Sequence, residues 1–389
     1  MKSLSIIEIV KSALFIGVLV TTFNSAIPHL AMALFLLLLT LLNRDINKKV
    51  SFLYLIPLMI FFISLINTLI YLNINVDANS TMMIFRARKY FFELIVSYSI
   101  IFFCLNTNEE KVLKLIYNAI VISVVVGVAE FIADPTERPS MLFLEPSSAG
   151  YFIGTFIFLV FYQNKFTVRA LFITSLVLLR SKSMIFSMFV AFVVHKFDIK
   201  KYILVLFLIT ISGGAIHEYL MDNSGQYFGF VHLVETLYRY GIDGFSASHG
   251  IYNTYLTRLS GILLGVDTLI DKPFGIGFGS FHEIYASKLF NYFTISDIGD
   301  EVLTTFTNGG MVTPKSNLIE QFLNAGILGC AFFIFYLKSI MKGKDVFFRT
   351  SVICFVILSL VTELNNFYLY MLLLAYFSKG NSFDKRKSV

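Results

Sequence analysis

The chain has 389 residues, of which 57% are hydrophobic and only 14% are charged, and its mean hydropathy is +0.76. Soluble domains are about half apolar and about one quarter charged, so this composition excludes an ordinary soluble domain. The net charge of +6 agrees better with basic cytoplasmic loops and anionic lipid than with nucleic acid, so no nucleic-acid partner is expected. The composition indicates a membrane protein surrounded by membrane lipids.

Apolar runs of about 17–25 residues, the length that crosses a hydrocarbon core, follow one another along the chain. The first run carries Glu8 and Lys11 and leads directly into a second, which favours a membrane helix over a cleaved signal peptide. We expect an all-α polytopic membrane protein of about twelve transmembrane helices, with one large extracytoplasmic loop that contains short helices. The predicted spans are 4–23, 26–42, 51–72, 84–105, 112–133, 146–162, 167–180, 184–197, 201–217, 316–338, 349–363 and 366–378.

Lysine and arginine in alternate turns orient these spans, because cytoplasmic loops carry an excess of positive charge. The basic turns fall on one side if the N-terminus is cytoplasmic. The basic tail joins them only if the last apolar stretch is two helices turning at 363–366, which favours twelve helices over eleven. The predicted organisation is transmembrane helices 1–9 in 1–217, a large periplasmic or extracytoplasmic loop in 218–315, transmembrane helices 10–12 in 316–378, and a cytoplasmic basic tail in 379–389.

Within the loop, apolar residues recur at helical spacing through 256–270, with Arg258 at a polar position. This pattern predicts an amphipathic helix that lies on or dips into the membrane interface. Pro273 and the glycine run that contains Gly275 and Gly277 end this helix, and glycine there permits a tight turn against other backbone. The run is not a dinucleotide fingerprint, because no βαβ pattern precedes it.

Basic residues on the extracytoplasmic side need an explanation other than the positive-inside rule. Arginine presents a planar fork that matches phosphate oxygens, so a ring of arginines at the outer face suits the diphosphate head group of a lipid. The alternative for each single residue is snorkelling to the interface, or pairing with a carboxylate such as Glu93, Asp134 or Glu145. The residues of this set are Arg86, Arg88, Lys89, Arg138, Arg180, Lys182, Arg239 and Arg258.

Candidates for acid–base chemistry lie near the same face. Glu145 precedes Pro146 at a predicted helix start, where it either favours the helix N-terminus electrostatically or acts as an acid or base. Four of the six histidines lie in the loop or at its edge. His249 and His282 are candidate general bases for a sugar hydroxyl, and the alternative is that they are ordinary surface residues. Neither the histidines nor the three cysteines show metal-ligand spacing, so no metal and no cofactor are expected.

Four segments carry a resemblance to a known family. They are an Arg…Glu-Pro-Ser turn in Arg138 to Gly150, a Ser-rich basic turn in Leu178 to Ser183, an Arg followed by Pro-x-Gly-x-Gly in Arg258 and Asp271 to Gly279, and an Asn…Glu helix start in Ser316 to Gly329. With these motifs in this order on one membrane side, the chain resembles the Wzy-type polysaccharide polymerases of the O-antigen polymerase and ligase superfamily. No single motif is specific, but together they span nearly the whole chain.

The resemblance implies a glycosyltransferase of polysaccharide biosynthesis, an O-antigen or capsule polymerase in the bacterial inner (cytoplasmic) membrane with its active face outside the cytoplasm. The donor would be a growing glycan on undecaprenyl diphosphate, and the acceptor a single repeat unit on a second carrier. A separate chain-length regulator is a candidate partner. Fixed arginines would stabilise the leaving diphosphate. The expected diphosphate-binding residues are Arg258, Arg180, Arg138, Arg86, Arg88 and Lys182, and the expected catalytic residues are Glu145, His249 and His282.

One position departs from the pattern of the superfamily. The ligase branch places a histidine, its proposed base, just before the asparagine of the fourth segment, where this chain has Ser316. The difference favours a polymerase over an O-antigen ligase that completes lipopolysaccharide by transfer to the lipid A core. A lipid-linked glycan transporter would show pseudo-symmetric halves and charges at bilayer depth. A non-catalytic assembly scaffold would tolerate the loss of every outer arginine.

Overall fold

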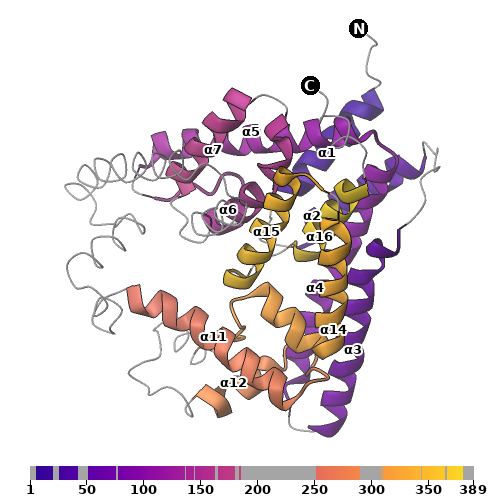
Figure 1. The fold of residues 1–389 in the computed structure, drawn as a ribbon, viewed down its shortest axis with the longest axis vertical. Coiled ribbons are helices and arrows are strands. Elements are labelled where there is room, and N and C mark those ends of the chain that lie inside the picture. The colour runs from indigo at the N-terminus through magenta and orange to yellow at the C-terminus, as the bar shows by residue number, and fades with distance from the viewer. Residues whose placement is uncertain are drawn as a thin grey trace.

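Every regular element in the described part of the chain is a helix, and the computed structural model contains no strand there. The elements are two short 3-10 helices and twelve α-helices whose labels follow Figure 1. The described residues are 6–20, 26–42, 51–75, 78–135, 137–143, 145–162, 165–179, 184, 251–289, 308, 310–342, 344–363 and 366–379.

The helix bounds follow the apolar runs of the sequence. In the first half of the chain they are α1 Ile6–Val20, α2 Ala26–Leu41, η1 Phe52–Tyr54, α3 Ile56–Ile74, α4 Ser80–Leu105, α5 Glu109–Ala133, α6 Pro146–Phe156, η2 Leu159–Tyr162 and α7 Lys165–Leu179. In the second half they are α11 Ile251–Asp271, α12 Phe281–Leu289, α14 Asn317–Met341, α15 Val346–Val361 and α16 Phe367–Lys379.

The predicted spans coincide with helices, to within about one turn, wherever the structure describes them. Most of 184–217 and of the loop 218–315 lies outside the described residues. Three helical stretches are long and apolar enough to cross a membrane, namely Phe52–Ile74, Glu109–Ala133 and Asn317–Met341. The structure therefore supports an all-helical membrane protein, while the number of twelve spans stays a prediction.

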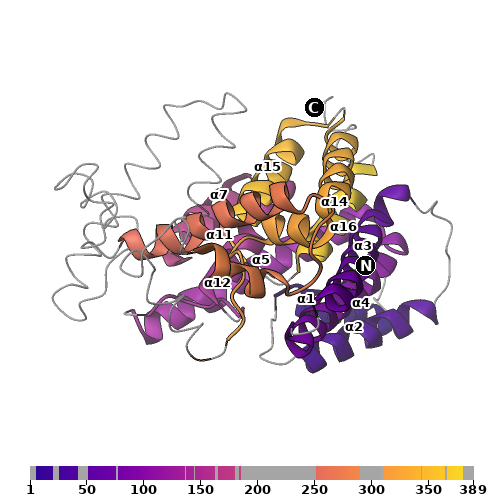
Figure 2. The same cartoon turned by 90° about the horizontal axis from the view of Figure 1, so that it is seen from below.

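The helices form two sides around a buried centre. In Figures 1 and 2, α3 and α4 stand on one side of the molecule, and α7 and α11 lie on the other. Helix α14 packs on α3, and α16 packs on α4. In Figure 1, α11 and α12 lie toward the end of the bundle opposite α1 and α5.

The last apolar stretch folds as two helices, α15 and α16, with the turn near 363–366 that the charge pattern predicts. Every residue of α16 from Phe367 to Phe377 is buried. A helix that is apolar all round belongs in the interior, because it has no polar face to turn toward water. In α16 the ring of Tyr370 packs against Tyr151, Phe152 and Phe156 of α6. This helix is the centre of the core.

The predicted amphipathic helix of the loop is present as α11 and ends at Asp271, just before Pro273. Lys288 of α12 donates a hydrogen bond to Asp267 at 2.6 Å and a second one to Asp271. Partial burial lowers the pKa of Lys288, but these bonds and the aspartate charges outweigh burial, so the pKa lies above its ordinary value. The ion pairs join α12 to the end of α11.

Helix α14 is interrupted at Gly326, whose φ of 64° and ψ of −156° lie outside the helical region. The loop after α11, which contains the glycine run, supplies hydrogen-bond partners to the interrupted backbone. The backbone N–H of Ile276 donates to the carbonyl of Leu323 at 2.8 Å, and that of Ile327 donates to the carbonyl of Pro273 at 2.7 Å. A broken membrane helix is tolerated only where its freed backbone groups find partners, which this loop supplies.

Helix α3 holds the same loop from its other side. Asn67 donates from Nδ2 to the carbonyl of Phe274 at 2.7 Å and to that of Asn324 at 2.9 Å. The glycines make this approach possible, because a Cβ on Gly275 would lie 2.6 Å from the backbone nitrogen of Gly326, and one on Gly277 would lie 2.3 Å from that of Thr68. The glycine run forms a tight turn wedged between two other backbones.

Gly326→Ala should destabilise the fold by at least about 1–3 kcal/mol, because only glycine adopts this backbone conformation without strain. The added Cβ would also lie 2.1 Å from the carbonyl carbon of Phe274. Thermal unfolding of the purified protein in detergent measures the effect. Gly17→Ala in α1 is the control, since its Cβ would meet nothing closer than the Met32 sulfur at 3.5 Å. Equal melting temperatures for the two variants would contradict the predicted strain.

Candidate functional site

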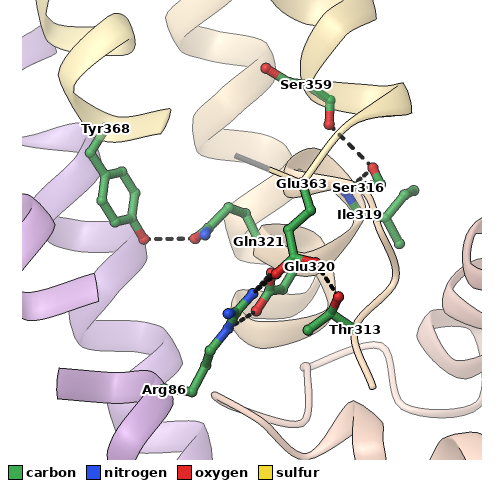
Figure 3. Close-up of polar contacts among 9 residues, drawn as sticks. All are labelled: Arg86, Thr313, Ser316, Ile319, Glu320, Gln321, Ser359, Glu363 and Tyr368. Carbon is green, nitrogen blue, oxygen red and sulfur yellow. Dashed lines mark hydrogen bonds and ion pairs between the residues drawn. The ribbon is translucent and has the colours of Figure 1, made fainter. Parts of the chain in front are cut away.

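A buried cluster of charged side chains joins α4, α14 and the turn between α15 and α16 (Figure 3). At its centre Arg86 donates from Nε and Nη2 to the two carboxylate oxygens of Glu320, each at 2.6 Å. The same Nη2 donates to Oε1 of Glu363 at 2.6 Å. Arg86 and Glu320 are only 6% and 3% exposed. The cluster is therefore a bidentate ion pair withdrawn from solvent, with a second carboxylate attached.

Glu363 is the more accessible of the two carboxylates on Arg86. Its side chain is 19% exposed, compared with 5% for Glu320. Its second oxygen, Oε2, accepts a hydrogen bond from the hydroxyl of Thr313. Each oxygen of Glu363 thus has a donor, which fixes the orientation of a carboxylate that is still partly open to the surroundings.

The start of α14 is built to place Glu320 against α4. The hydroxyl of Ser316 caps this helix by accepting from the backbone N–H of Ile319 at 3.2 Å. The backbone N–H of Asn317 donates to the carbonyl of Thr362 at 3.0 Å, which ties the helix start to the turn that carries Glu363. The cap and this tie bring the two carboxylates together on one arginine.

Further polar contacts surround the cluster. Tyr368 donates from its hydroxyl to Oε1 of Gln321 at 2.6 Å, and its backbone N–H donates to Glu93 at 2.7 Å. The guanidinium of Arg86 lies over the ring of Tyr90, 5.4 Å from its centre. Tyr368 of α16 is thus tied to α14 through Gln321 and to α4 through Glu93.

The charges of the cluster limit what it can bind. Arg86 is balanced by two carboxylates, and Lys89, one turn further along α4, interacts electrostatically with both. An arginine paired in this way is not an open phosphate site. Burial raises the pKa of Glu363, but the charges of Arg86 and Lys89 and the hydrogen bond from Thr313 outweigh burial and lower this pKa to about 2. Glu363 is therefore an ionised carboxylate that Arg86 positions; it can accept a proton from a hydroxyl, but it is a weak base.

The first two resemblance segments meet in the structure. Arg138 donates from Nε and Nη2 to the carbonyl of Leu179 at 3.1 and 2.8 Å. Partial burial lowers the pKa of the Arg138 guanidinium, and the charge of Glu145 offsets part of this change. Glu145 itself is exposed and accepts a hydrogen bond from Ser147 at 3.0 Å. The structure thus holds Arg138 and Glu145 close enough for their charges to interact.

The other predicted site residues are placed as follows. His282 accepts at Nδ1 from the backbone N–H of Val312 at 3.1 Å. Arg88 is exposed, with its guanidinium 5.2 Å from the centre of the Phe85 ring. The backbone of Arg258 lies in α11, and its side chain lies outside the described part of the structure. Arg180, Lys182 and His249 lie outside the described residues.

Glu320 and Glu363 were not predicted as site residues. An ionisable residue within an apolar membrane stretch is by default a candidate for function, and both carboxylates carried that signal. Their shared partner could not be read from local sequence, because Arg86 lies 234 positions before Glu320 and 277 before Glu363. Only the tertiary structure, in which α16 packs on α4 and Arg86 reaches the start of α14, shows that they belong together.

Comparison with known proteins adds no neighbour. No family model matches the chain, and no curated protein and no solved structure matches it significantly. Among the described residues, no group of three or more His, Cys, Asp or Glu side chains is arranged to hold a metal ion.

Arg86→Ala should lower the free energy of unfolding by about 3–5 kcal/mol, because it leaves buried carboxylates without their cation. The double variant Arg86→Met with Glu320→Leu should recover part of the loss, since it removes both buried charges of the bidentate pair. Denaturation of the purified protein in detergent measures both.

Lys111→Ala is the matched control for that measurement. It breaks the exposed pair with Glu8, whose atoms are 3.4 Å apart, and should cost less than about 1 kcal/mol. A similar loss for Arg86→Ala and Lys111→Ala would contradict a structural role for the buried cluster.

Proposed function

We propose that this chain is a polysaccharide polymerase of the O-antigen or capsule type. It would transfer a growing glycan from undecaprenyl diphosphate to a lipid-linked repeat unit on the outer face of the bacterial inner membrane. In this proposal the chain crosses the membrane twelve times, and α11 and α12 belong to the extracytoplasmic loop. The resemblance of four sequence segments motivates the proposal.

The observation that carries the proposal is that these four segments are joined in space. Arg138 of the first segment binds the carbonyl of Leu179 in the second at 2.8 Å. Backbone hydrogen bonds join the third and fourth segments around Gly326. Tyr151, which directly follows the first segment, shares a hydrogen bond of 2.5 Å with the hydroxyl of Ser359. The backbone carbonyl of Ser359 in turn accepts a hydrogen bond of 3.2 Å from the hydroxyl of Ser316 in the fourth segment. Segments far apart in sequence thus form one connected region, as parts of a single site would.

The proposed reaction is a single displacement at a sugar carbon. An acceptor hydroxyl attacks the anomeric carbon of the donor glycan, and the bond from that carbon to the diphosphate oxygen breaks. Undecaprenyl diphosphate leaves with the electron pair, and a base takes the proton of the hydroxyl. Arginines stabilise the leaving anion, and Arg258, Arg180 and Arg138 with Lys182 are the proposed contacts. For the base, Glu363 joins Glu145, His249 and His282.

Two other functions compete with the polymerase. An O-antigen ligase would use the same donor but transfer the glycan to the lipid A core, and the serine at position 316 argues against it. A lipid-linked glycan transporter is favoured by one observation, the buried charges on α4, since charges at membrane depth often mark a transport path. These charges are paired directly with one another in one compact cluster, which fits a fixed site better than a transport path.

Deletion of the gene in its native host tests these functions directly. A polymerase predicts that single repeat units reach the lipid A core or accumulate on the carrier, because only the joining of repeats is lost. A gel ladder of surface and lipid-linked polysaccharide measures this. Long polymer stranded on the carrier beside bare lipid A core would identify a ligase. An unchanged ladder would exclude both enzymes.

Glu363→Gln should shorten the ladder to single repeats while the protein remains folded and abundant. The amide keeps the size of the side chain but has one accepting oxygen where the carboxylate has two, so it keeps only part of the bonding to Arg86 and Thr313. It cannot accept the proton, and loss of a general base lowers rates by about 10²–10⁴-fold. Glu110→Gln, at an exposed carboxylate in the first turn of α5, is the control and should polymerise normally. Normal chain length in the Glu363→Gln strain would assign the base to another residue.

A further inference from the structure

A long apolar groove opens on the outer surface between α2, α3 and α4. Its volume is about 1010 Å³, at the upper end of the range for ligand pockets in proteins. The groove faces the surroundings, since Phe62, Leu69 and Ile84 on its walls are 51%, 55% and 61% exposed. Its walls include Leu58, Phe61, Leu65, Ala87, Phe91 and Ile95.

The groove offers apolar contact and one positive charge. Arg88 is the single charged side chain among its described lining residues, and within the described part of the chain it forms no ion pair. Three hydroxyls on the walls already donate to backbone carbonyls: Thr68 to Ser64 and Ser99 to Ile95, each at 2.8 Å, and Tyr98 to Tyr54. The groove therefore suits a molecule with a long apolar chain and one anionic end.

The length of the groove distinguishes between lipids. On α4 the lining runs from Ile84 to Leu105, roughly 32 Å at a rise of about 1.5 Å per residue. The hydrocarbon core of a bilayer is about 30 Å thick, so an ordinary acyl chain from one leaflet reaches only about 15 Å. A single chain that fills the groove must be about twice as long, which favours a long isoprenoid over a phospholipid.

The groove is separated from the charged cluster by the width of α4. Arg86 and Arg88 are two positions apart, so their side chains leave the helix in directions roughly 200° apart. Arg86 enters the buried cluster, whereas Arg88 lines the outer groove. A phosphate at Arg88 would therefore lie away from Glu363, on the opposite side of the helix.

This separation fits one of the two lipid-linked substrates better than the other. The donor reacts at the carbon bonded to its diphosphate, so its phosphate must lie at the reaction centre. The acceptor reacts at the far end of its repeat unit, so its phosphate lies at least the length of that unit away. We propose that the groove binds the isoprenoid tail of the acceptor carrier, with the carrier phosphate at Arg88. This assignment rests on the proposed polymerase function.

Native mass spectrometry of the purified full chain with undecaprenyl phosphate tests the groove. The wild-type protein should keep one molecule of this lipid in the presence of excess phosphatidylglycerol. Arg88→Gln removes the cation, and Ala87→Phe fills the groove beside it, so each should weaken retention at least about tenfold. The controls are Arg349→Gln, an exposed arginine of α15, and Val125→Phe, a 59% exposed position of α5 outside the groove. Both should bind as the wild type does.

The outcomes separate the groove from the function. Displacement of undecaprenyl phosphate by phosphatidylglycerol from the wild-type protein would show an ordinary lipid contact and overturn the proposal. Equal retention by Arg88→Gln and the wild type would also overturn it, because Arg88 is an exposed side chain and its replacement leaves the buried core unchanged. If deletion of the gene leaves the ladder unchanged while the groove variants lose the lipid, the polymerase function and the acceptor role both fail, and only a polyprenyl-phosphate site remains. A shortened ladder with groove variants that bind normally would retain the polymerase and reject the groove.

A kinetic measurement distinguishes the acceptor role from the donor role. With lipid-linked repeat units extracted from the host, Arg88→Gln should raise the acceptor KM at least about tenfold and leave kcat nearly unchanged, because the reaction centre is untouched. A fall in kcat without a change in acceptor KM would place Arg88 at the donor diphosphate and overturn the acceptor assignment.

Discussion

The interaction on which the rest of this structure depends is the pairing of Arg86 with Glu320 and Glu363. Isolated charges in an apolar interior cost several kcal/mol each, so the three side chains tolerate burial only together. Their pairing holds α4 against the start of α14 and against the turn before α16. Because α16 is buried along almost its whole length, the position of that turn also determines where the core helix begins.

The fold uses irregular backbone in α14, the helix that carries Glu320 of the candidate site. Helix α14 breaks at Gly326, and the loop after α11 supplies the missing backbone partners. This exchange ties a loop segment to a membrane-length helix, and Asn67 of α3 ties both to a third element. Helix α4 then separates two environments, a charged cluster on one face and an apolar groove on the other. In the proposed polymerase these environments would serve the reaction and the second carrier, respectively.

Much of the helical framework could be predicted from the sequence, because membrane helices are encoded locally. The apolar runs and their charged turns place most helices to within about one turn, and the break between α15 and α16 follows from the basic tail alone. The amphipathic pattern through 256–270 likewise locates α11. The candidate site was harder to predict from the sequence. Arg86 was singled out, but as a phosphate contact, and its two carboxylate partners were not recognised as site residues.

What the sequence by itself determined is therefore the helices within the described part of the chain and the glycines that allow a tight turn, since each depends on neighbouring residues only. The tertiary structure alone decided which charges meet. Glu363 lies 277 positions from Arg86, and no local pattern records a contact over that distance. It also decided that Arg86 and Arg88, almost adjacent in sequence, serve opposite faces of one helix. The physical reason is that burial and pairing depend on how helices pack, and a charge has no defined partner until they do.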